Sequence, residues 1–472
     1  MTKVSDLTAR FAPFAERMQR EQMPEIVIEN FKHYYAILAT GSTGMIPEES
    51  IEPVQEVAKY ASLASYREAG LAALPKAVML KLNGGLGTGM GLEKAKSLLV
   101  VRDKLSFLDI IIRQNLFLRK EYNCFIPLVL MNSFSTDADT KEVLGRYPEL
   151  EGKIASTFLQ NKVPKVLVDS LEPAEWPASP DLEWCPPGHG ELYLSLVTTG
   201  LLDKLLAEGY EYLFVSNADN LGATLDPTIL GYMASNETPF LMEVTARTEA
   251  DKKGGHIARR RSDGQLLLRE IAQCPEEDLD DFQDVGRHGY FNTNNIWIRL
   301  SKLKQVLQQH NNMLKLPMIR NSKSLDPRDS SSPAVYQLET AMGAALEVFP
   351  GAEVLQVERS RFMPVKTCQD LLVVRSDIYQ LDEHFHLTIA PERTLGTPVV
   401  ELDGRYFKLI DDFEQRIPEP PSLIDCAQLK VTGDVLFEPG LVLRGSVAIS
   451  NSSNEQRSLR ATEPIVDQTI EL

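Results

Sequence analysis

The residues with the clearest chemical potential form a glycine-rich loop that contains two lysines. Residues 81–97 read KLNGGLGTGMGLEKAKS. Glycine lets backbone amides approach and turn toward phosphate oxygens that a Cβ would obstruct. Lys94 or Lys96 could add an ammonium to the same negative charge. The loop therefore predicts a polyphosphate site, and the alternative is a mobile surface loop that merely tolerates glycine.

The glycine spacing excludes two commoner nucleotide loops. A P-loop needs a glycine directly before its lysine, and Glu93 stands before Lys94. The dinucleotide pattern G-x-G-x-x-G would need a third glycine where Met90 stands. Its acidic residue about twenty positions on is also missing, since Asp103 and Asp109 come too early. A kinase of the P-loop type and a dinucleotide-dependent dehydrogenase are therefore disfavoured.

A second chemical segment is VSNADNLG at residues 215–222. It places Asp219 just beyond the end of an apolar strand, where open α/β sheets bind their ligands. A carboxylate there can hold Mg²⁺, which prefers one or two carboxylates together with phosphate oxygens. A turn held by Asx hydrogen bonds is the alternative, and the segment alone leaves both open.

The elements that must position these residues form an alternating α/β pattern from about residue 70 to 380. A helix is predicted at 106–120, after the glycine loop. Strands are predicted at 77–80, 126–131, 212–215, 240–244, 266–271, 295–298 and 354–357. Such alternation is typical of a mostly parallel sheet.

The two ends of the chain differ from this middle part. Residues 1–65 carry helical spacing without a strand signal, and we expect an N-terminal helical segment. Residues 429–449 show short β runs punctuated by glycines, which predicts a small β-helix, with a short β-sandwich as the alternative. The predicted domains are 1–65, a catalytic domain 66–388 and a β-helix 389–472. Residues 321–333, rich in serine, predict an exposed mobile loop.

The amino-acid composition limits the classes of molecule that the protein is expected to bind. The 472 residues are 43% hydrophobic and 24% charged, as in a globular protein of several domains. A net charge of -17 disfavours nucleic acid and anionic membranes as partners, so an anionic substrate needs a locally positive pocket. Five scattered cysteines without a CxxC predict neither disulfides nor a zinc site and favour the cytoplasm. No apolar run is long enough to span a bilayer.

Seven strings, in order along the chain, resemble the eukaryotic-type UDP-glucose pyrophosphorylase family. They read LNGGLGTGMG, MNSFSTDADT, PPGHGELY, NADNLGA, YFNTNNIW, LETAMGAA and RFMPVKTCQDLLVVRSDIY. The resemblance implies a GT-A/Rossmann-like α/β nucleotidyltransferase core with a mixed, mostly parallel sheet and a small C-terminal β-helix. It also implies the substrates UTP and glucose 1-phosphate and the products UDP-glucose and pyrophosphate.

This reaction needs no general base. The second pKa of a phosphate monoester is about 6, so the sugar phosphate is already an anion when it attacks the α-phosphorus in line. Alignment of two polyanions and neutralisation of developing charge remain to be supplied. The resemblance assigns these catalytic roles to Lys96 on the UTP phosphates, Asp219 on Mg²⁺, and Lys366 between the two substrates.

Further site residues are carried over from the same strings. The UTP-binding residues implied, besides Lys96 and Asp219, are Leu82, Asn83, Gly84, Gly85, Met131, Gln160 and Gly190. Those implied for the sugar phosphate, besides Lys366, are His189, Asn217, Glu270, Asn292 and Asn294. His384 and His386, outside these sets, are expected to be solvated or packed in a core.

Departures from the family pattern concentrate in the glycine loop, at Gly89, Lys94 and Ala95. We expect Lys96 to keep the phosphate role and Lys94 to face solvent. One alternative function is a uridylyltransferase of relaxed sugar choice, or one specific for an N-acetylhexosamine. Another is a catalytically silent nucleotide-sugar-binding protein, which would be expected to lack Lys96, Asp219 or Lys366. The C-terminal β-helix could also mediate a homo-oligomer.

Overall fold

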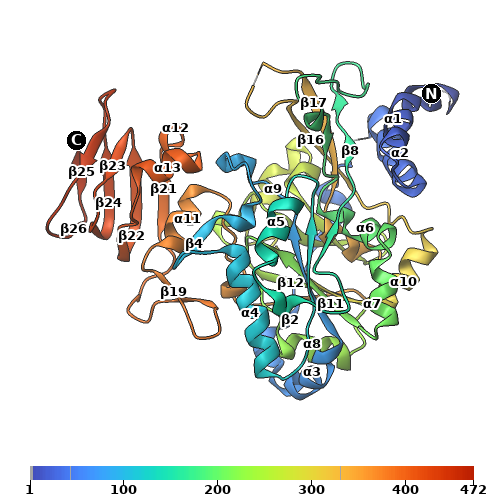
Figure 1. The fold of residues 1–472 in the computed structure, drawn as a ribbon, viewed down its shortest axis with the longest axis horizontal. Helices are drawn as coiled ribbons and strands as arrows, with labels where there is room; N and C mark the ends of the chain where they lie inside the picture. The colour runs from blue at the N-terminus through green and yellow to red at the C-terminus, as the bar shows by residue number, and fades with distance from the viewer. Residues whose placement is uncertain (1–3, 43, 330) are drawn as a thin grey trace.

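The computed structural model describes residues 4–42, 44–329 and 331–472. Its centre is a mixed sheet of eleven strands, with the path β2-β18-β12-β15-β11-β3-β6-β7 (Figure 1). The bounds are β1 Ile51–Pro53, β2 Ala58–Lys59, β3 Ala77–Asn83, β6 Leu128–Asn132, β7 Thr157–Leu159, β11 Tyr212–Asn217, β12 Phe240–Ala246, β13 His256–Arg260, β14 Leu266–Arg269, β15 Tyr290–Arg299 and β18 Glu353–Gln356. Along the path only β15 runs antiparallel to its neighbours, β11 and β12. The predicted mixed, mostly parallel sheet is confirmed.

Helices cover both faces of the sheet. Side chains alternate along the central strands, so each strand sends apolar side chains to both faces. From β3, Ala77 and Met79 join the core beneath one set of helices, and Val78 and Leu80 join the core beneath the other. The first set comprises α4 Phe107–Glu121, α8 Pro227–Ser235 and α11 Cys368–Arg375. The second comprises α6 Leu192–Thr198, α7 Leu201–Ala207 and α10 Leu300–Gln309. The helix predicted at 106–120 is thus α4, which begins at a capping box of Ser106 and Asp109.

The carboxyl ends of β3, β6, β7 and β11 lie at one edge of the sheet, since these strands are parallel. Pairing brings Leu82 beside Asn217, and Asn83 beside Asn132. The loops that leave these strands therefore converge, which is where open α/β sheets bind ligands.

The N-terminal part is only partly helical. The helices α1 Val4–Arg20 and α2 Glu25–Ala39 pack on each other through Phe14, Phe31 and other aromatic side chains. The prediction that residues 1–65 are helical without strands is wrong after α2. There β1 pairs with β13 and β2 pairs with β18 in the central sheet. Such two- and three-residue strands are defined by their partners rather than by a local pattern. Residues 1–3 lie outside the described residues.

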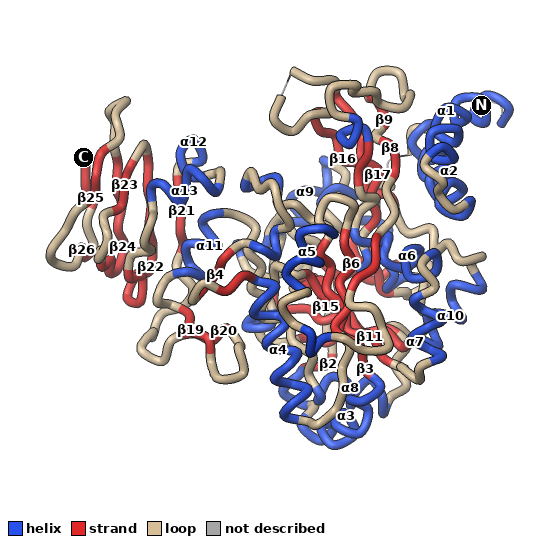
Figure 2. Tube along the Cα trace, viewed as in Figure 1, coloured by secondary structure: helices blue, strands red, loops and turns tan. Residues whose placement is uncertain are grey.

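The C-terminal strands form parallel rungs (Figure 2). They are β21 Val399–Leu402, β22 Ser422–Thr432, β23 Val435–Phe437, β24 Val442–Ser450, β25 Arg457–Leu459, β26 Ile465–Val466 and β27 Thr469–Glu471. Parallel neighbours confirm the β-helix over the antiparallel sandwich. Gly433 has a φ of 85°, and a Cβ there would lie 2.1 Å from the Asn451 carbonyl oxygen, so this turn needs glycine. Among the residues that the structure describes, no helix is both long and apolar enough to cross a membrane.

Candidate active site

A cavity of about 880 Å³ opens at the carboxyl edge of the sheet. Its floor comes from the strand ends and the glycine loop, and its opposite wall comes from the hairpin of β16 Met318–Ser324 and β17 Ala334–Thr340. The residues expected for the substrates that line it are Leu82, Asn83, Gly84, Gly85, Lys96, Met131, Gln160, His189, Asn217 and Asp219. The tertiary structure therefore brings together ten of the predicted residues from segments far apart in the chain.

Two of the cavity-lining side chains, Lys96 and Asp219, form an ion pair. Lys96 Nζ lies 2.7 Å from Asp219 Oδ2, and the two side chains are only 15% and 19% exposed. The Lys96 backbone N–H donates to the Gly85 carbonyl at 3.2 Å, which folds the glycine loop back on itself. Lys94 is exposed and outside the cavity lining, as expected.

Asp219 also has a free oxygen. Its Oδ1 is buried and has no hydrogen-bond partner within the described part of the chain. A buried carboxylate oxygen without a donor is costly unless a cation or a ligand binds it. A hard divalent cation prefers such an oxygen, so Asp219 fits the predicted metal role.

Two glycines of the loop are required by its geometry. Gly87 has a φ of 71°, in the left-handed region. A Cβ on Gly84 would lie 2.2 Å from Gln160 Nε2, so a larger residue would displace the Gln160 amide from its place against the loop. Gln160 is 7% exposed and lines the cavity beside Met131, which suits it to the edge of a base.

Two residues expected to bind UTP, Asn83 and Gly190, have contacts within the protein that explain why asparagine and glycine stand at these positions. Asn83 donates both amide protons to the protein, to Asn132 Oδ1 at 2.8 Å and to Thr140 Oγ1 at 2.9 Å. Gly190 is outside the cavity lining, and a Cβ there would lie 2.3 Å from Thr340 Oγ1. Close packing against β17 is the observed reason for glycine at position 190.

His189 is held as a neutral donor. The Met342 backbone N–H donates to His189 Nδ1 at 2.9 Å, so the ring proton is on Nε2. Burial lowers the pKa of His189 to about 4, and the imidazole is uncharged near neutral pH. It can donate one hydrogen bond into the cavity, which it lines beside Asn217.

The other four sugar-phosphate residues, Glu270, Asn292, Asn294 and Lys366, are outside the cavity lining. Glu270 and Lys366 interact electrostatically. Burial raises the pKa of Glu270, and the Lys366 ammonium opposes that rise. Lys366 follows Val365, whose N–H donates to the Asp219 carbonyl at 3.2 Å. Lys366 and Glu270 therefore belong to a region that adjoins Asp219.

The two asparagines lie beside this region. The Asn292 backbone N–H donates to the Gly255 carbonyl at 3.1 Å, and Gly255 packs directly on the Glu270 carboxylate. Asn292 Nδ2 donates to Asn294 Oδ1 at 2.9 Å, and Asn294 has a φ of 57°. Asparagine tolerates this left-handed conformation better than most residues.

Two lysines that the sequence reasoning missed also line the cavity. Lys165 is 4% exposed and donates to the Leu325 carbonyl at 3.0 Å. Burial lowers the pKa of Lys165, with a smaller lowering from the nearby Lys323. Lys323 lies on β16. The sequence predicts a mobile loop at residues 321–333, and this prediction is wrong for residues 321–324, which belong to the strand. Ser330 of the same segment lies outside the described residues.

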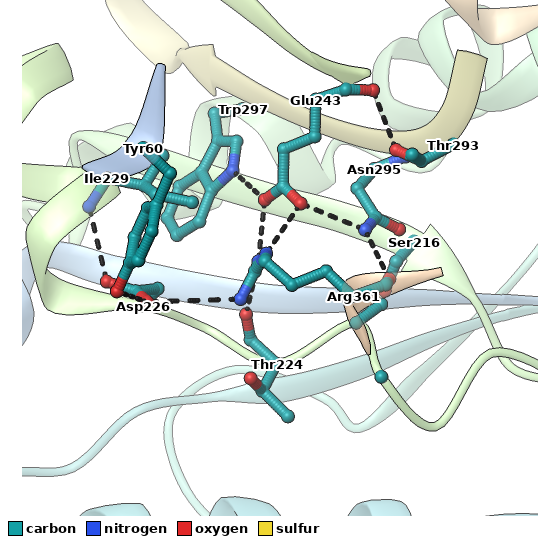
Figure 3. A network of polar contacts seen from close by, with 12 residues as sticks. Tyr60, Ser216, Thr224, Asp226, Ile229, Glu243, Thr293, Asn295, Trp297 and Arg361 are labelled. Carbon is teal, nitrogen blue, oxygen red and sulfur yellow. Dashed lines mark hydrogen bonds and ion pairs between the residues drawn. The ribbon is translucent and has the colours of Figure 1, made fainter. Parts of the chain in front are cut away.

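A buried network of charged and polar side chains surrounds Glu243 and Arg361 (Figure 3). Glu243 on β12 is 0% exposed and accepts two hydrogen bonds from Arg361, Nε to Oε2 at 2.7 Å and Nη2 to Oε1 at 2.6 Å. Trp297 Nε1 donates to Glu243 at 2.8 Å, and Asn295 Nδ2 donates at 3.0 Å. A single carboxylate in an otherwise apolar predicted strand is the signal that could have revealed this network.

The same network fastens together the two segments that carry Asp219 and Lys366. Arg361 Nη2 donates to the Thr224 carbonyl at 2.9 Å. Asn220 Nδ2 donates to the Arg361 carbonyl at 3.1 Å, and Asn220 Oδ1 accepts from the Met363 N–H at 2.9 Å. The Glu243–Arg361 pair therefore holds the segments around Asp219 and Lys366 together.

Replacing Arg361 by alanine is expected to lower the free energy of unfolding by about 3–5 kcal/mol, since the buried Glu243 carboxylate loses its counter-charge. Chemical denaturation followed by fluorescence measures this change. Arg146→Ala is the control, because its pair with Glu142 is exposed on both sides and should contribute at most about 1 kcal/mol. Equal losses in the two variants would contradict a structural role for the buried pair.

A cavity that combines a phosphate loop with an ammonium and a free carboxylate oxygen suits transfer between two phosphates, so the class of protein is a nucleotidyltransferase. The profile of the UTP–glucose-1-phosphate uridylyltransferase family matches residues 28–444. The chain belongs to this family.

Individual relatives agree with the family match. The UTP–glucose-1-phosphate uridylyltransferase of Saccharomyces cerevisiae is 44% identical over 395 residues, which cover 84% of this chain and 77% of that protein. A crystal structure of UDP-glucose phosphorylase from Trypanosoma brucei superposes with a TM-score of 0.91 at 43% identity. The match covers 98% of this chain and 100% of the Trypanosoma brucei chain. A point mutant of the Leishmania major UDP-glucose pyrophosphorylase, in complex with UDP-glucose, also has a TM-score of 0.91 at 43% identity, with 98% and 99% coverage.

Proposed function

We propose that this chain, a UTP–glucose-1-phosphate uridylyltransferase, aligns its two substrates across the Lys96–Asp219 pair. This pair is the observation that carries the proposal, because an ammonium and a carboxylate lie 2.7 Å apart in the cavity lining. The sugar phosphate attacks the α-phosphorus of UTP, its oxygen forms the new P–O bond, and the bond to pyrophosphate breaks. Both product groups remain anions, so no proton has to be moved.

The nucleotide occupies the side of the glycine loop in this proposal. The backbone at Leu82, Gly84 and Gly85 and the Gln160 amide offer donors and acceptors to uracil, with Met131 beneath the base. Lys96 then turns from Asp219 to the phosphates as negative charge develops there. Lys165 and Lys323 on the opposite wall supply further positive charge for a triphosphate in a protein of net charge -17.

The sugar phosphate occupies the side of His189 and Asn217. The neutral His189 donates from Nε2 without adding charge, and Asn217 offers an amide at the strand end. Lys366 lies between the two phosphates, and Glu270, Asn292 and Asn294 accept from or donate to the sugar hydroxyls. The contacts between Lys366, Glu270 and the Asp219 segment support this division.

Asp219 would hold Mg²⁺, because its buried Oδ1 has no hydrogen-bond partner among the residues that the structure describes. When bound, the ion neutralises phosphate charge and acts as a template for the in-line arrangement. Lys96 Nζ lies 2.7 Å from Oδ2 of the same carboxylate, so Asp219 would hold the ion beside the ammonium that acts on the phosphates. We further propose a cytoplasmic location, which the five free cysteines support. Homo-oligomer formation through the β-helix stays a prediction.

The test is pyrophosphate release from UTP and glucose 1-phosphate, measured with Mg²⁺ and with excess chelator. Release is expected only with both substrates and Mg²⁺, and absence of release with Mg²⁺ would overturn the proposal. Galactose 1-phosphate and N-acetylglucosamine 1-phosphate are the controls for the sugar. Equal rates with all three would support the relaxed-specificity alternative instead.

A further inference from the structure

A group of metal-ligand side chains lies outside the active-site cavity, on the turn between β19 Tyr379–Leu381 and β20 Leu387–Ile389. Asp382, His384 and His386 each offer one ligand atom, and these atoms all lie within 4.8 Å of one another. The side chains are 31%, 38% and 43% exposed, so an ion can reach them from solvent. The sequence-based expectation for these histidines is solvated or core-packed side chains, and Asp382 is not among the residues expected at a site.

The turn is held in shape by contacts that leave ligand atoms available. Asp382 Oδ1 accepts from the backbone N–H of His384 at 2.9 Å and of His386 at 2.7 Å, so Oδ2 is left facing His386 Nδ1 at 3.7 Å. The Phe117 ring of α4 packs on the His384 ring at 4.3 Å between centroids. One imidazole and the backbone around the carboxylate are therefore ordered without an ion.

A neighbouring residue anchors the turn to the body of the protein. Gln114 of α4 is 4% exposed and donates to the Phe385 carbonyl at 2.9 Å. It also donates to the Leu221 carbonyl at 3.2 Å, two residues beyond Asp219. The turn is thus tied to the active-site loop through one buried side chain.

We propose that Asp382, His384 and His386 bind one zinc ion. Two imidazole nitrogens and a carboxylate oxygen suit Zn²⁺, whereas Mg²⁺ prefers oxygen ligands. In a tetrahedral site with bonds of about 2.1 Å, ligand atoms lie about 3.4 Å apart, so small rotations of the exposed side chains complete the geometry.

A fourth ligand is available beside the three. Glu383 Oε1 lies 3.5 Å from His384 Nε2, so this carboxylate or a water can complete the coordination.

The test is calorimetric titration of the full chain with Zn²⁺ in excess Mg²⁺, which saturates oxygen-only sites. One zinc site is expected in the wild type, and the double variant His384→Ala, His386→Ala should bind at least about tenfold more weakly. His310→Ala is the matched control, because His310 is an exposed histidine at the end of α10. It should bind as the wild type does.

Two further measurements distinguish the outcomes. Circular dichroism should show the double variant folded, and the absorption spectrum of bound Co²⁺ should show nitrogen ligation in the wild type that the double variant lacks. Equal Zn²⁺ affinity in all three proteins would overturn the proposal. Loss of Zn²⁺ binding on Asp219→Asn, with no loss on the double variant, would assign the ion to the active site and overturn it equally.

Discussion

Lys96→Ala is expected to lower kcat for UDP-glucose synthesis by about 100- to 1,000-fold, with a smaller effect on the KM for UTP. Lys96 Nζ is 15% exposed and lies in the cavity beside Asp219, so its charge acts where water screens it little. Charge on the α-phosphoryl and the leaving group develops in the transition state, and the loss should therefore fall mainly on kcat. Steady-state pyrophosphate release with saturating glucose 1-phosphate measures it.

The matched control is Lys94→Ala, two positions earlier in the same loop. Lys94 is exposed and outside the cavity lining, so its removal should change kcat by less than about threefold. A loss in Lys94→Ala as large as that in Lys96→Ala would show that the two lysines share the phosphate role. The expectation that Lys94 only faces solvent would then be wrong.

Asp219→Asn is expected to lower kcat by about 1,000-fold, which corresponds to about 4 kcal/mol of transition-state stabilisation. The substitution keeps the size of the side chain but removes the charge that pairs with Lys96. It also removes the anionic Oδ1, which accepts no hydrogen bond from the described part of the chain. Affinity for Mg²⁺ should fall together with kcat. Activity as a function of Mg²⁺ concentration, and binding of the spin probe Mn²⁺, measure the two effects.

Asp181→Asn is the control for charge in the cavity. Asp181 also lines the cavity but is exposed, and its loss should leave the Mg²⁺ dependence unchanged. Unchanged Mn²⁺ binding in Asp219→Asn would contradict a metal role for Asp219. Activity lost without any change in metal affinity would instead indicate that Asp219 only orients Lys96.

The amino-acid sequence by itself determined the features whose physical cause is local. The glycine loop could be identified because phosphate binding needs several close backbone amides in one short segment. Asp219 could be placed at a strand end because an apolar run directly precedes it. The β-helix could be inferred because each rung repeats the same short pattern, and parallel pairing of β21 to β27 bears this out.

Only the tertiary structure decided the contacts between distant segments. Of the residues expected as ligands of UTP, Asn83 donates a hydrogen bond to Thr140, and Gly190 packs closely on Thr340. The tertiary structure also added Lys165 to the cavity wall, and it joined Glu243 to Arg361 across 118 positions of sequence. Each of these depends on which strands lie side by side and on which side chains are then buried together. A local pattern of residue types carries no information on that choice, because the partner that satisfies a buried charge is chosen by the topology of the sheet.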